Sequence, residues 1–357
     1  MNALAPAADG RRPSRAPGPR SIEVALPTFN SAGYLPALLD SLFAQTRQDF
    51  TILVADDGSS DATPDVLRAY VRKWPGRIRE LAPGGGRRGV IGNFDRLIAH
   101  SRADYVFLCD HDDVWLPDKM ERTLDAMSRL EAAHGRDTPL LVHTDLVVAG
   151  ADLHVLAPSF FAYSRIDPRR NSPRELLLAN VVTGCTTLVN RALYRRAAPI
   201  PQEAMMYDHW LALVAATTGA LAYVDAPTIL YRQHGANAIG AKRPSLARRV
   251  YGTLISRDRE RVLTRYARQA EILLERFGSE LAPRERAAAE TLAHLWSLPR
   301  LRRFSALRRC GLGLEGLVRN VALFIVVLRA PRRSDGMAAE KERMVGPEGF
   351  EPPTKPL

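Results

Sequence analysis

Short apolar runs alternate with stretches of helical spacing over the first part of this chain. A run such as 105–110 (YVFLCD) holds few polar residues, which is typical of a strand buried on both faces of a parallel sheet. Strands that alternate with helices indicate an α/β fold. We therefore expect a Rossmann-like, mostly parallel sheet flanked by helices. The expected strands lie at 22–27, 50–57, 77–81 and 105–110, and the expected helices at 34–45, 64–73 and 93–100.

A second set of elements continues to about residue 240, after which the pattern changes. Beyond residue 245, Arg, Ala, Leu and Glu recur at helical spacing without a strand pattern, so we expect an α-helical appendage. The predicted organisation is a disordered basic tail (1–20), an α/β catalytic domain (21–240), a basic helical region (245–330) and a disordered end (331–357). The second set comprises expected strands at 140–149, 183–190 and 220–234 and expected helices at 173–179 and 206–218.

The net charge of +11 is concentrated at the two ends of the chain. Residues 1–20 carry +3, residues 21–240 carry −3 and residues 241–357 carry +11. A basic end attracts anionic lipid or nucleic acid non-specifically, but it lacks a nucleic-acid-binding motif, so we expect no specific nucleic-acid partner. The apolar run 321–328 is too short to cross a bilayer. Together with the basic stretch before it, this run is either an interfacial helix on an anionic membrane or a helical cap packed on the core.

Three scattered cysteines, Cys109, Cys185 and Cys310, exclude a disulfide scaffold and the paired spacing of a structural zinc site. A reducing compartment fits them best. The expected location is therefore the cytoplasm, with peripheral contact at the inner face of the plasma membrane as the alternative that the basic helices leave open.

Acidic residues collect where the expected strands end. The segments concerned are 26–30 (LPTFN), 55–61 (ADDGSSD) and 109–119 (CDHDDVWLPDK). Ligands of open α/β sheets bind outside the carboxyl ends of the strands, and carboxylate oxygens are preferred by Mg²⁺ and Mn²⁺. The acids therefore predict a divalent-cation site that also accepts phosphates. For 56–61 a plain turn and helix cap is the stronger interpretation of that segment alone.

These three segments, in this order and at these spacings, resemble the inverting glycosyltransferases of family 2, which have the GT-A fold. The resemblance covers about residues 21–240. The segments DHDDVWLPDK, VTGCTTLVN, YDHW and YRQHG are most similar to the rhamnosyltransferase-type branch that builds bacterial surface polysaccharide. The resemblance implies a Mg²⁺- or Mn²⁺-dependent enzyme. Its donor would be a dTDP- or UDP-sugar, with rhamnose as the candidate sugar, and its acceptor a lipid-linked or polysaccharide glycan.

The resemblance also implies roles for individual residues of the donor site. Asp112 would bind the metal directly, with Asp110 and His234 beside it, and Arg232 would bind the diphosphate. Arg88 lies in the loop 84–89, which is either a segment that reaches the donor or an ordinary flexible connection. The residues implied in binding the donor nucleotide are Pro27, Thr28, Asp57, Arg88 and Asp110.

Transfer with inversion requires a base that takes the proton of the acceptor hydroxyl. Asp208, at the start of the helix expected at 206–218, falls where the family has its catalytic Asp. Many members carry Glu-Asp there, whereas this chain has Tyr207 before the Asp, which leaves the role of that first position open. The alternatives are that Asp208 only stabilises the helix N-terminus, or that His209 is the base.

Other functions fit the sequence less well. Direct displacement needs no covalent intermediate, so we expect Cys185 to pack in the core. A sugar-nucleotide nucleotidyltransferase would carry a Gly-rich, basic phosphate loop after its first strand, and a dehydrogenase would carry G-x-G-x-x-G; LPTFNSAGY is neither. A catalytically silent scaffold of a polysaccharide assembly complex remains the non-enzyme alternative. Trp115 and Trp210, each close to a candidate acid, line a sugar site or belong to the core.

Overall fold

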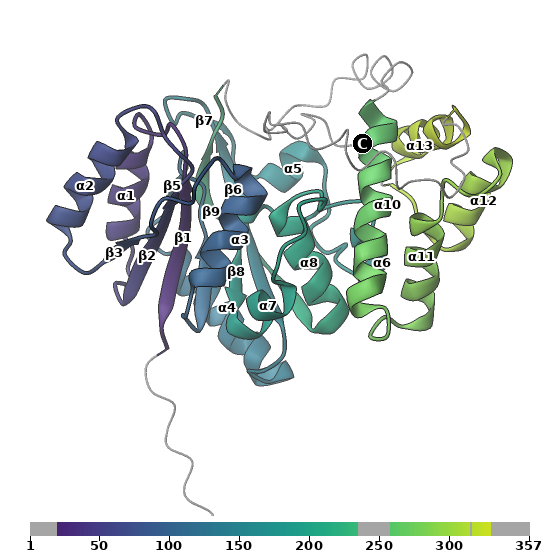
Figure 1. Cartoon of the computed structure of the whole chain (residues 1–357), viewed down its shortest axis with the longest axis horizontal. Coiled ribbons are helices and arrows are strands. Elements are labelled where there is room, and N and C mark those ends of the chain that lie inside the picture. Colours follow the sequence, from purple (N-terminus) through teal and green to yellow (C-terminus); the bar gives the residue numbers. More distant parts are fainter. Residues whose placement is uncertain (1–19, 235–257, 315, 330–357) are drawn as a thin grey trace, which may run out of the picture.

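The computed structural model describes residues 20–234, 258–314 and 316–329. Its strands are β1 (Ile22–Thr28), β2 (Phe50–Asp56), β3 (Ile78–Glu80), β4 (Tyr105–Leu108), β5 (Val114–Trp115), β6 (Leu140–Ala149), β7 (Val155–Ala157), β8 (Leu188–Asn190) and β9 (Ala220–Arg232). Within the described part of the chain, all nine join one sheet in the order β3-β2-β1-β4-β8-β6-β9-β5, with β7 paired to β6 (Figure 1).

The sheet is parallel in its first half and mixed in its second. β3, β2, β1 and β4 run parallel, as the alternation of strands and helices predicts. β8 runs antiparallel to both β4 and β6, β9 runs parallel to β6, and the short β5 pairs antiparallel with β9. The carboxyl ends of β1, β2 and β4 therefore share one edge, which is where the predicted acids lie.

Helices cover both faces of the sheet (Figure 1). Leu35, Leu39 and Met120 belong to the core on one face, and Phe94, Leu193 and Trp210 to the core on the other. The helices are α1 (Leu35–Phe43), α2 (Thr63–Lys73), α3 (Gly89–His100), α4 (Lys119–His134), α5 (Phe160–Ser164), α6 (Pro173–Leu176), α7 (Arg191–Ala197), α8 (Tyr207–Thr218), α10 (Asp258–Phe277), α11 (Pro283–Ala293), α12 (Arg300–Arg309) and α13 (Leu317–Arg329).

The helices that follow residue 257 pack directly on the sheet domain. Phe277, Leu292 and Trp296 join the same apolar core as Trp210 of α8. Arg276 of α10 also donates to backbone carbonyls at the end of α7, including those of Ala197 and Ala198 at 3.0 and 2.9 Å. The helical region is therefore confirmed over its described residues. The expected disorder of 1–19 and 331–357, and the expected helix over 245–257, lie outside the described residues.

Two expected elements are shorter than their patterns predict. The strand expected at 183–190 is a 3₁₀ turn, η1 (Gly184–Thr186), followed by the short β8. The hydroxyls of Thr186 and Thr187 donate to the carbonyl of Thr183 at 2.7 and 3.1 Å, and such local bonds compete with strand pairing. The helix expected at 173–179 ends at Leu176.

One long helix, α4, is absent from the expected elements. Met120, Leu124 and Met127 recur at helical spacing and are buried, so the pattern needed to predict it is present. The helix begins directly after the acidic segment 109–119. None of the helices in the described ranges combines the length and the apolar character that a bilayer crossing requires.

Candidate active site

The ends of β1 and β2 are held together by side chains that build a turn. The strand register sets Thr28 beside Asp56, and the Thr28 hydroxyl donates to Asp56 Oδ1 at 2.8 Å. Asp56 also accepts the N–H and hydroxyl of Ser59 at 2.8 and 2.6 Å. Asp61 accepts the backbone N–H groups of Ala32 and Thr63 at 3.0 and 2.9 Å. Asp56 and Asp61 therefore have the turn and cap roles that the segment alone favours.

Asp57 lies next to this turn and faces the start of α3. Its two carboxylate oxygens accept the backbone N–H groups of Arg88 and Gly89 at 2.7 and 2.8 Å. The Arg88 guanidinium folds back and donates to the carbonyl of Gly84 at 3.1 Å. The structure thus brings Thr28, Asp57 and the backbone of Arg88 to one edge, with Pro27 in the same strand end. Their contact with a nucleotide stays a prediction.

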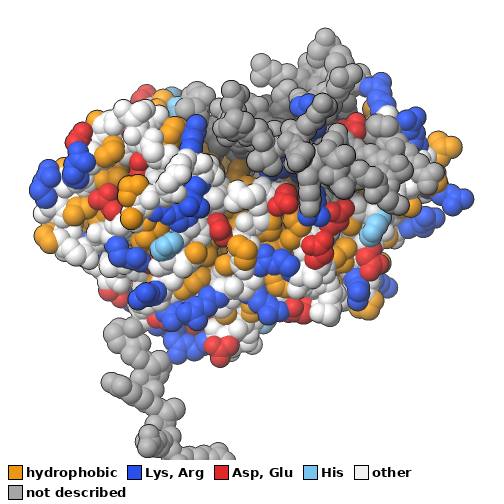
Figure 2. All heavy atoms as spheres, viewed as in Figure 1, with side chains coloured by type: hydrophobic (Ala, Val, Ile, Leu, Met, Phe, Trp, Pro, Cys, Tyr) orange, Lys and Arg blue, Asp and Glu red, His pale blue; other side chains and the backbone are white. Residues whose placement is uncertain are grey.

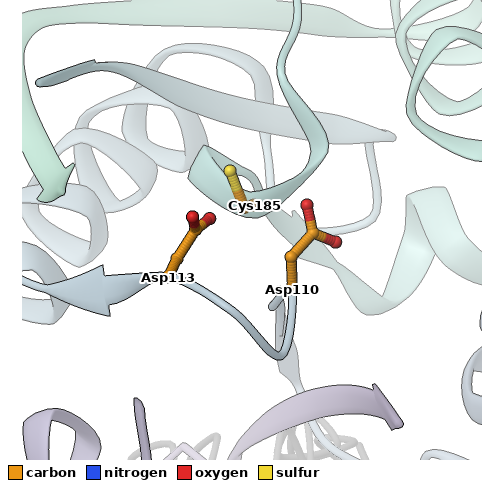
Figure 3. A group of neighbouring side chains, drawn as sticks. All are labelled: Asp110, Asp113 and Cys185. Carbon is orange, nitrogen blue, oxygen red and sulfur yellow. The ribbon is translucent and has the colours of Figure 1, made fainter. Parts of the chain in front are cut away.

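The loop that follows β4 carries two acids that point toward a cysteine of η1: Asp110 and Asp113 lie close to Cys185 (Figure 3). One ligand atom from each lies within 4.8 Å of the others, a separation that a metal ion could bridge. Asp113 is fully buried, and its Oδ2 has no hydrogen-bond partner among the described residues. Burial, followed by the nearby Asp112 and Asp110, raises the pKa of Asp113 well above its usual range. The sequence offers Asp113 as one of the acids but assigns it no role.

Asp112 pairs with His234 on the other side of the same loop. His234 Nε2 and Asp112 Oδ2 are 2.8 Å apart, and the imidazole stacks on Tyr34 with 4.5 Å between ring centroids. Burial opposes ionisation of Asp112, but the hydrogen bond with His234, followed by the electrostatic effects of His111 and His234, outweighs it and holds the pKa of Asp112 below its usual range. The structure therefore places two predicted metal ligands, 122 residues apart in the chain, in direct contact.

The acids of this loop fit a divalent cation. Burial, then Asp112 and then Asp208, raise the pKa of Asp110 to about 7. Carboxylates so close to one another repel unless a proton or a cation neutralises them. Their oxygen donors suit Mg²⁺ or Mn²⁺. Among the described residues, the group whose ligand atoms lie within 4.8 Å of one another is Asp110, Asp113 and Cys185, so the structure does not bring the predicted ligands Asp110, Asp112 and His234 to that spacing.

Arg232, at the end of β9, holds the acidic loop in place. Its backbone N–H donates to Asp113 Oδ1 at 3.2 Å, and its Nε donates to the carbonyl of Asp112 at 2.9 Å. The guanidinium also donates to the carbonyl of Ala151 at 2.5 Å and lies 5.1 Å from the Tyr34 ring centroid. In this structure Arg232 therefore bonds to the backbone, and its predicted contact with a diphosphate stays a prediction.

Asp208 is buried at the first turn of α8. Its Oδ2 accepts the backbone N–H of Gly184 at 2.9 Å and its Oδ1 accepts the Asn180 amide at 3.1 Å. Burial raises the pKa of Asp208 to about 7 against these hydrogen bonds, which favour the ionised form. A carboxylate with a pKa near neutrality is suited to take a proton.

His209, the alternative base, is part of the helix packing. Its Nε2 lies 2.6 Å from the carbonyl of Leu176, and its Nδ1 lies 3.4 Å from the Gln269 amide. Burial lowers the pKa of His209 to about 4. Both ring nitrogens thus have protein partners, and the geometry favours Asp208 over His209.

Tyr207 connects α8 to the acidic loop. Its phenol oxygen lies 3.4 Å from Asp110 Oδ1, and its ring stacks on Phe94 with 3.6 Å between centroids. The side chain is buried, and burial raises its pKa well above the usual range, so it is a neutral hydroxyl donor. Sequence reasoning left this position open; the structure shows that it contacts the acid loop.

A buried lysine lies beneath the loop. Lys119 Nζ donates to the carbonyl of Thr186 at 3.2 Å and lies 4.6 Å from the Trp115 ring centroid. Burial lowers the pKa of Lys119 to about 8. Sequence reasoning did not single it out, although it ends the segment WLPDK. Trp115, Trp210 and Cys185 are all buried among apolar side chains, as the core interpretation of each expects. Cys185 also lies beside Asp110 and Asp113, so packing is not its sole contact.

Comparisons with known proteins show which family this chain resembles. Residues 23–139 match the family described as glycosyl transferase family 2. An uncharacterized protein of Mycobacterium tuberculosis is 27% identical over 217 residues, covering 58% of this chain and 57% of its own. The dTDP-rhamnosyl transferase RfbG of Shigella flexneri is 25% identical over 229 residues, covering 60% and 73%. This chain spans little more than half the length of the first of these relatives.

Two solved structures have a related shape. The S. aureus TarS structure in complex with UDP-GlcNAc has a TM-score of 0.48 at 15% identity, covering 82% of this chain and 80% of that one. The mannosyltransferase PcManGT from Pyrobaculum calidifontis, in complex with GDP-Man and Mn²⁺, has a TM-score of 0.47 at 17% identity, covering 87% and 85%. The expected α/β GT-A domain with a helical C-terminal region is confirmed by the observed sheet, the helices after residue 257 and the family match. Over residues 23–139, and in its similarity to relatives named as glycosyltransferases, this chain resembles glycosyl transferase family 2.

Proposed function

We propose that this chain is a metal-dependent inverting glycosyltransferase of cell-surface glycan synthesis. Its donor is a dTDP- or UDP-sugar, with rhamnose as the candidate, and its acceptor is a lipid-linked or polysaccharide glycan. One observation carries the proposal: the fold brings Asp208, a buried carboxylate with a pKa of about 7, to the acidic loop, where Tyr207 contacts Asp110. The likeness to the dTDP-rhamnosyl transferase of Shigella flexneri supports the choice of donor.

The proposed reaction is a single in-line displacement. Asp208 accepts the proton of the acceptor hydroxyl, and the N–H of Gly184 and the amide of Asn180 fix the orientation of its carboxylate. Asp110, Asp112 and His234 would hold Mg²⁺ or Mn²⁺. When bound, the ion would offset the negative charge that develops on the leaving nucleotide diphosphate.

Asp57 and Thr28 form the proposed base site. The imide N–H that uracil and thymine share is a donor, and a carboxylate can accept it. Each Asp57 oxygen accepts one backbone N–H, and a carboxylate oxygen has two lone pairs, so capacity for the imide remains. A cytoplasmic location, where the three free cysteines stay reduced, belongs to the same proposal.

Calorimetric titration of UDP, dTDP, GDP and ADP, with and without Mn²⁺, tests this function. We expect metal-dependent binding of dTDP or UDP that Asp112→Asn loses. Asp118→Asn is the matched control, because Asp118 lies in the same segment but pairs with Arg122 at the surface. Sugar donors that carry the nucleotide found to bind are then tested as substrates, and release of the nucleotide diphosphate is measured. A folded protein that binds none of the four nucleotides would contradict the proposal and favour a silent scaffold.

A further inference from the structure

The last helix, α13, has two apolar faces. Ala322, Leu323, Val326 and Val327 are buried against the rest of the protein. Val321 is 48% exposed and Phe324 is 40% exposed on the opposite face. The half-buried Ile325 and Leu328 continue this face at the spacing i, i+3, i+4, i+7. We call these four outward residues, Val321, Phe324, Ile325 and Leu328, the outer stripe.

The outer stripe is fixed to α12 by a buried arginine and an aromatic pair. Arg303 of α12 donates from Nη1 to the carbonyl of Val327 at 3.1 Å and from Nη2 to that of Trp296 at 3.1 Å. Phe304 of α12 meets Phe324 edge-to-face, with 4.9 Å between centroids. The two helices thus present one surface, which also includes Leu301, a leucine that is 85% exposed.

The charged side chains of this segment are nearly all positive. Residues 295–329 contain seven arginines and a single acid, Glu315. Among the arginines of α12, Arg300, Arg302, Arg308 and Arg309 are exposed. In Figure 2, Lys and Arg spheres gather with hydrophobic ones at the right-hand end, where Figure 1 places α12 and α13.

Helix stability accounts for Arg308 and Arg309, which lie in the last turn of α12, but not for Arg300 and Arg302. The first turn of α12 contains no acid but holds Arg300 and Arg302, and cations at a helix N-terminus oppose the macrodipole. An exposed apolar face bordered by exposed arginines is instead the pattern of a helix that lies in a membrane interface. α13 has 13 residues and so spans only about 20 Å, too little to cross a bilayer core of about 30 Å.

We propose that α12 and α13 bind the surface of an anionic phospholipid membrane, with the outer stripe and Leu301 in the acyl–headgroup boundary and the exposed arginines on the phosphates. The charge complementarity selects anionic lipid over zwitterionic lipid. This inference does not depend on the transfer reaction. It would bring the sheet domain to a lipid-linked acceptor.

Co-sedimentation of the full chain with vesicles, without substrate, tests the inference. We expect binding to vesicles that contain phosphatidylglycerol, weak binding to pure phosphatidylcholine, and a decline with added salt as the charges are screened. Equal sedimentation with both lipids, or none with either, overturns it. Because the assay needs no catalysis, its failure is distinguishable from failure of the proposed enzyme activity.

The apolar part is tested by Val321→Ser/Phe324→Ser. We expect binding to fall by about tenfold or more, because the membrane no longer buries these side chains. The matched control is Val155→Ser/Leu156→Ser on β7, where the two residues are 60% and 48% exposed. This control should bind like the wild type. Equal binding by both variants would place the contact elsewhere.

The charged part is tested by Arg300→Gln/Arg302→Gln. Each basic residue near an anionic surface contributes about 1 kcal/mol, so binding should fall by about tenfold or more. The control is Arg68→Gln/Arg72→Gln on α2, at the other end of the molecule, because it removes the same number of positive charges. Loss in both variants to the same degree would mean that net charge, and not this surface, governs the binding. Thermal unfolding of all variants confirms that each is folded.

Discussion

Gly184 lies so close to Tyr207 that a Cβ built on the glycine would be 2.0 Å from the phenol oxygen. The same glycine donates its backbone N–H to Asp208 Oδ2 at 2.9 Å. One residue of η1 therefore positions both the proposed base and the hydroxyl that contacts Asp110. The absence of a side chain, rather than an unusual backbone angle, is what this position requires.

Gly184→Ala should impair the site more than the fold. The added methyl must displace the Tyr207 ring or η1, which we expect to lower the free energy of unfolding by about 1–3 kcal/mol and to reduce turnover by tenfold or more, since the Asp208 carboxylate loses its alignment. Urea unfolding and nucleotide-diphosphate release measure the two effects. Gly33→Ala is the control, because no atom lies within 4 Å of a Cβ there. Unchanged turnover in Gly184→Ala would refute the positioning role.

Tyr207→Phe tests the contact with Asp110 alone. The phenylalanine keeps the stacking on Phe94, while Asp110 loses a hydroxyl donor 3.4 Å away. We expect a stable protein whose Mn²⁺ affinity changes by about three- to tenfold, the equivalent of one hydrogen bond. Titration calorimetry with Mn²⁺ measures it. Tyr70→Phe removes a comparable bond to Asp40 at 2.8 Å far from the acids and should leave Mn²⁺ binding as it is.

The pH dependence of turnover should report Asp208. Because burial raises its pKa to about 7, the base form increases as the pH rises through that value, and kcat/KM should rise with it. If His209 were the base, its pKa of about 4 would place the rise of kcat/KM about three pH units lower. Asp208→Asn should abolish transfer and leave nucleotide binding intact. A limb near pH 4, or near-normal turnover in Asp208→Asn, would remove Asp208 from the mechanism.

The parallel half of the sheet could be predicted because its signals are local. Each of β1, β2 and β4 is mostly apolar, and the acids at the ends of β2 and β4 are adjacent in sequence to the strand that places them. The same locality made the segment 56–61 recognisable as a turn. Motif resemblance then extended the prediction to Asp208 and His234, whose local surroundings contain no sign of the acidic loop.

The contacts within the site could not be predicted, because they join distant parts of the chain. The sequence resemblance predicts that Arg232 binds the diphosphate, whereas in the structure its side chain donates to the carbonyl of Asp112. Asp113 is buried next to Cys185 because η1 turns at that point. Threonine hydroxyls that bond to the backbone hold this turn, whereas the sequence pattern there predicts a strand. Such side-chain-to-backbone bonds override strand propensity.

His143 of β6 offers a test of stability away from the site. The side chain is fully buried, and neither ring nitrogen has a hydrogen-bond partner among the described residues. Burial lowers its pKa from 6.5 to about 3. Between these values the unfolded chain binds the extra proton, so the folded state loses stability as the pH falls below 6.5.

His143→Leu should therefore stabilise the protein, and more so in acid. Removing two unpaired polar atoms should raise the free energy of unfolding by about 1–3 kcal/mol at pH 8. At pH 5 the advantage should grow by about 2 kcal/mol, because the wild type alone then protonates this position on unfolding. Urea unfolding at both pH values measures this, with the exposed His134→Leu expected to change stability by less than about 0.5 kcal/mol. A variant that is less stable than the wild type at pH 5 would show that the imidazole has a partner that the leucine cannot replace.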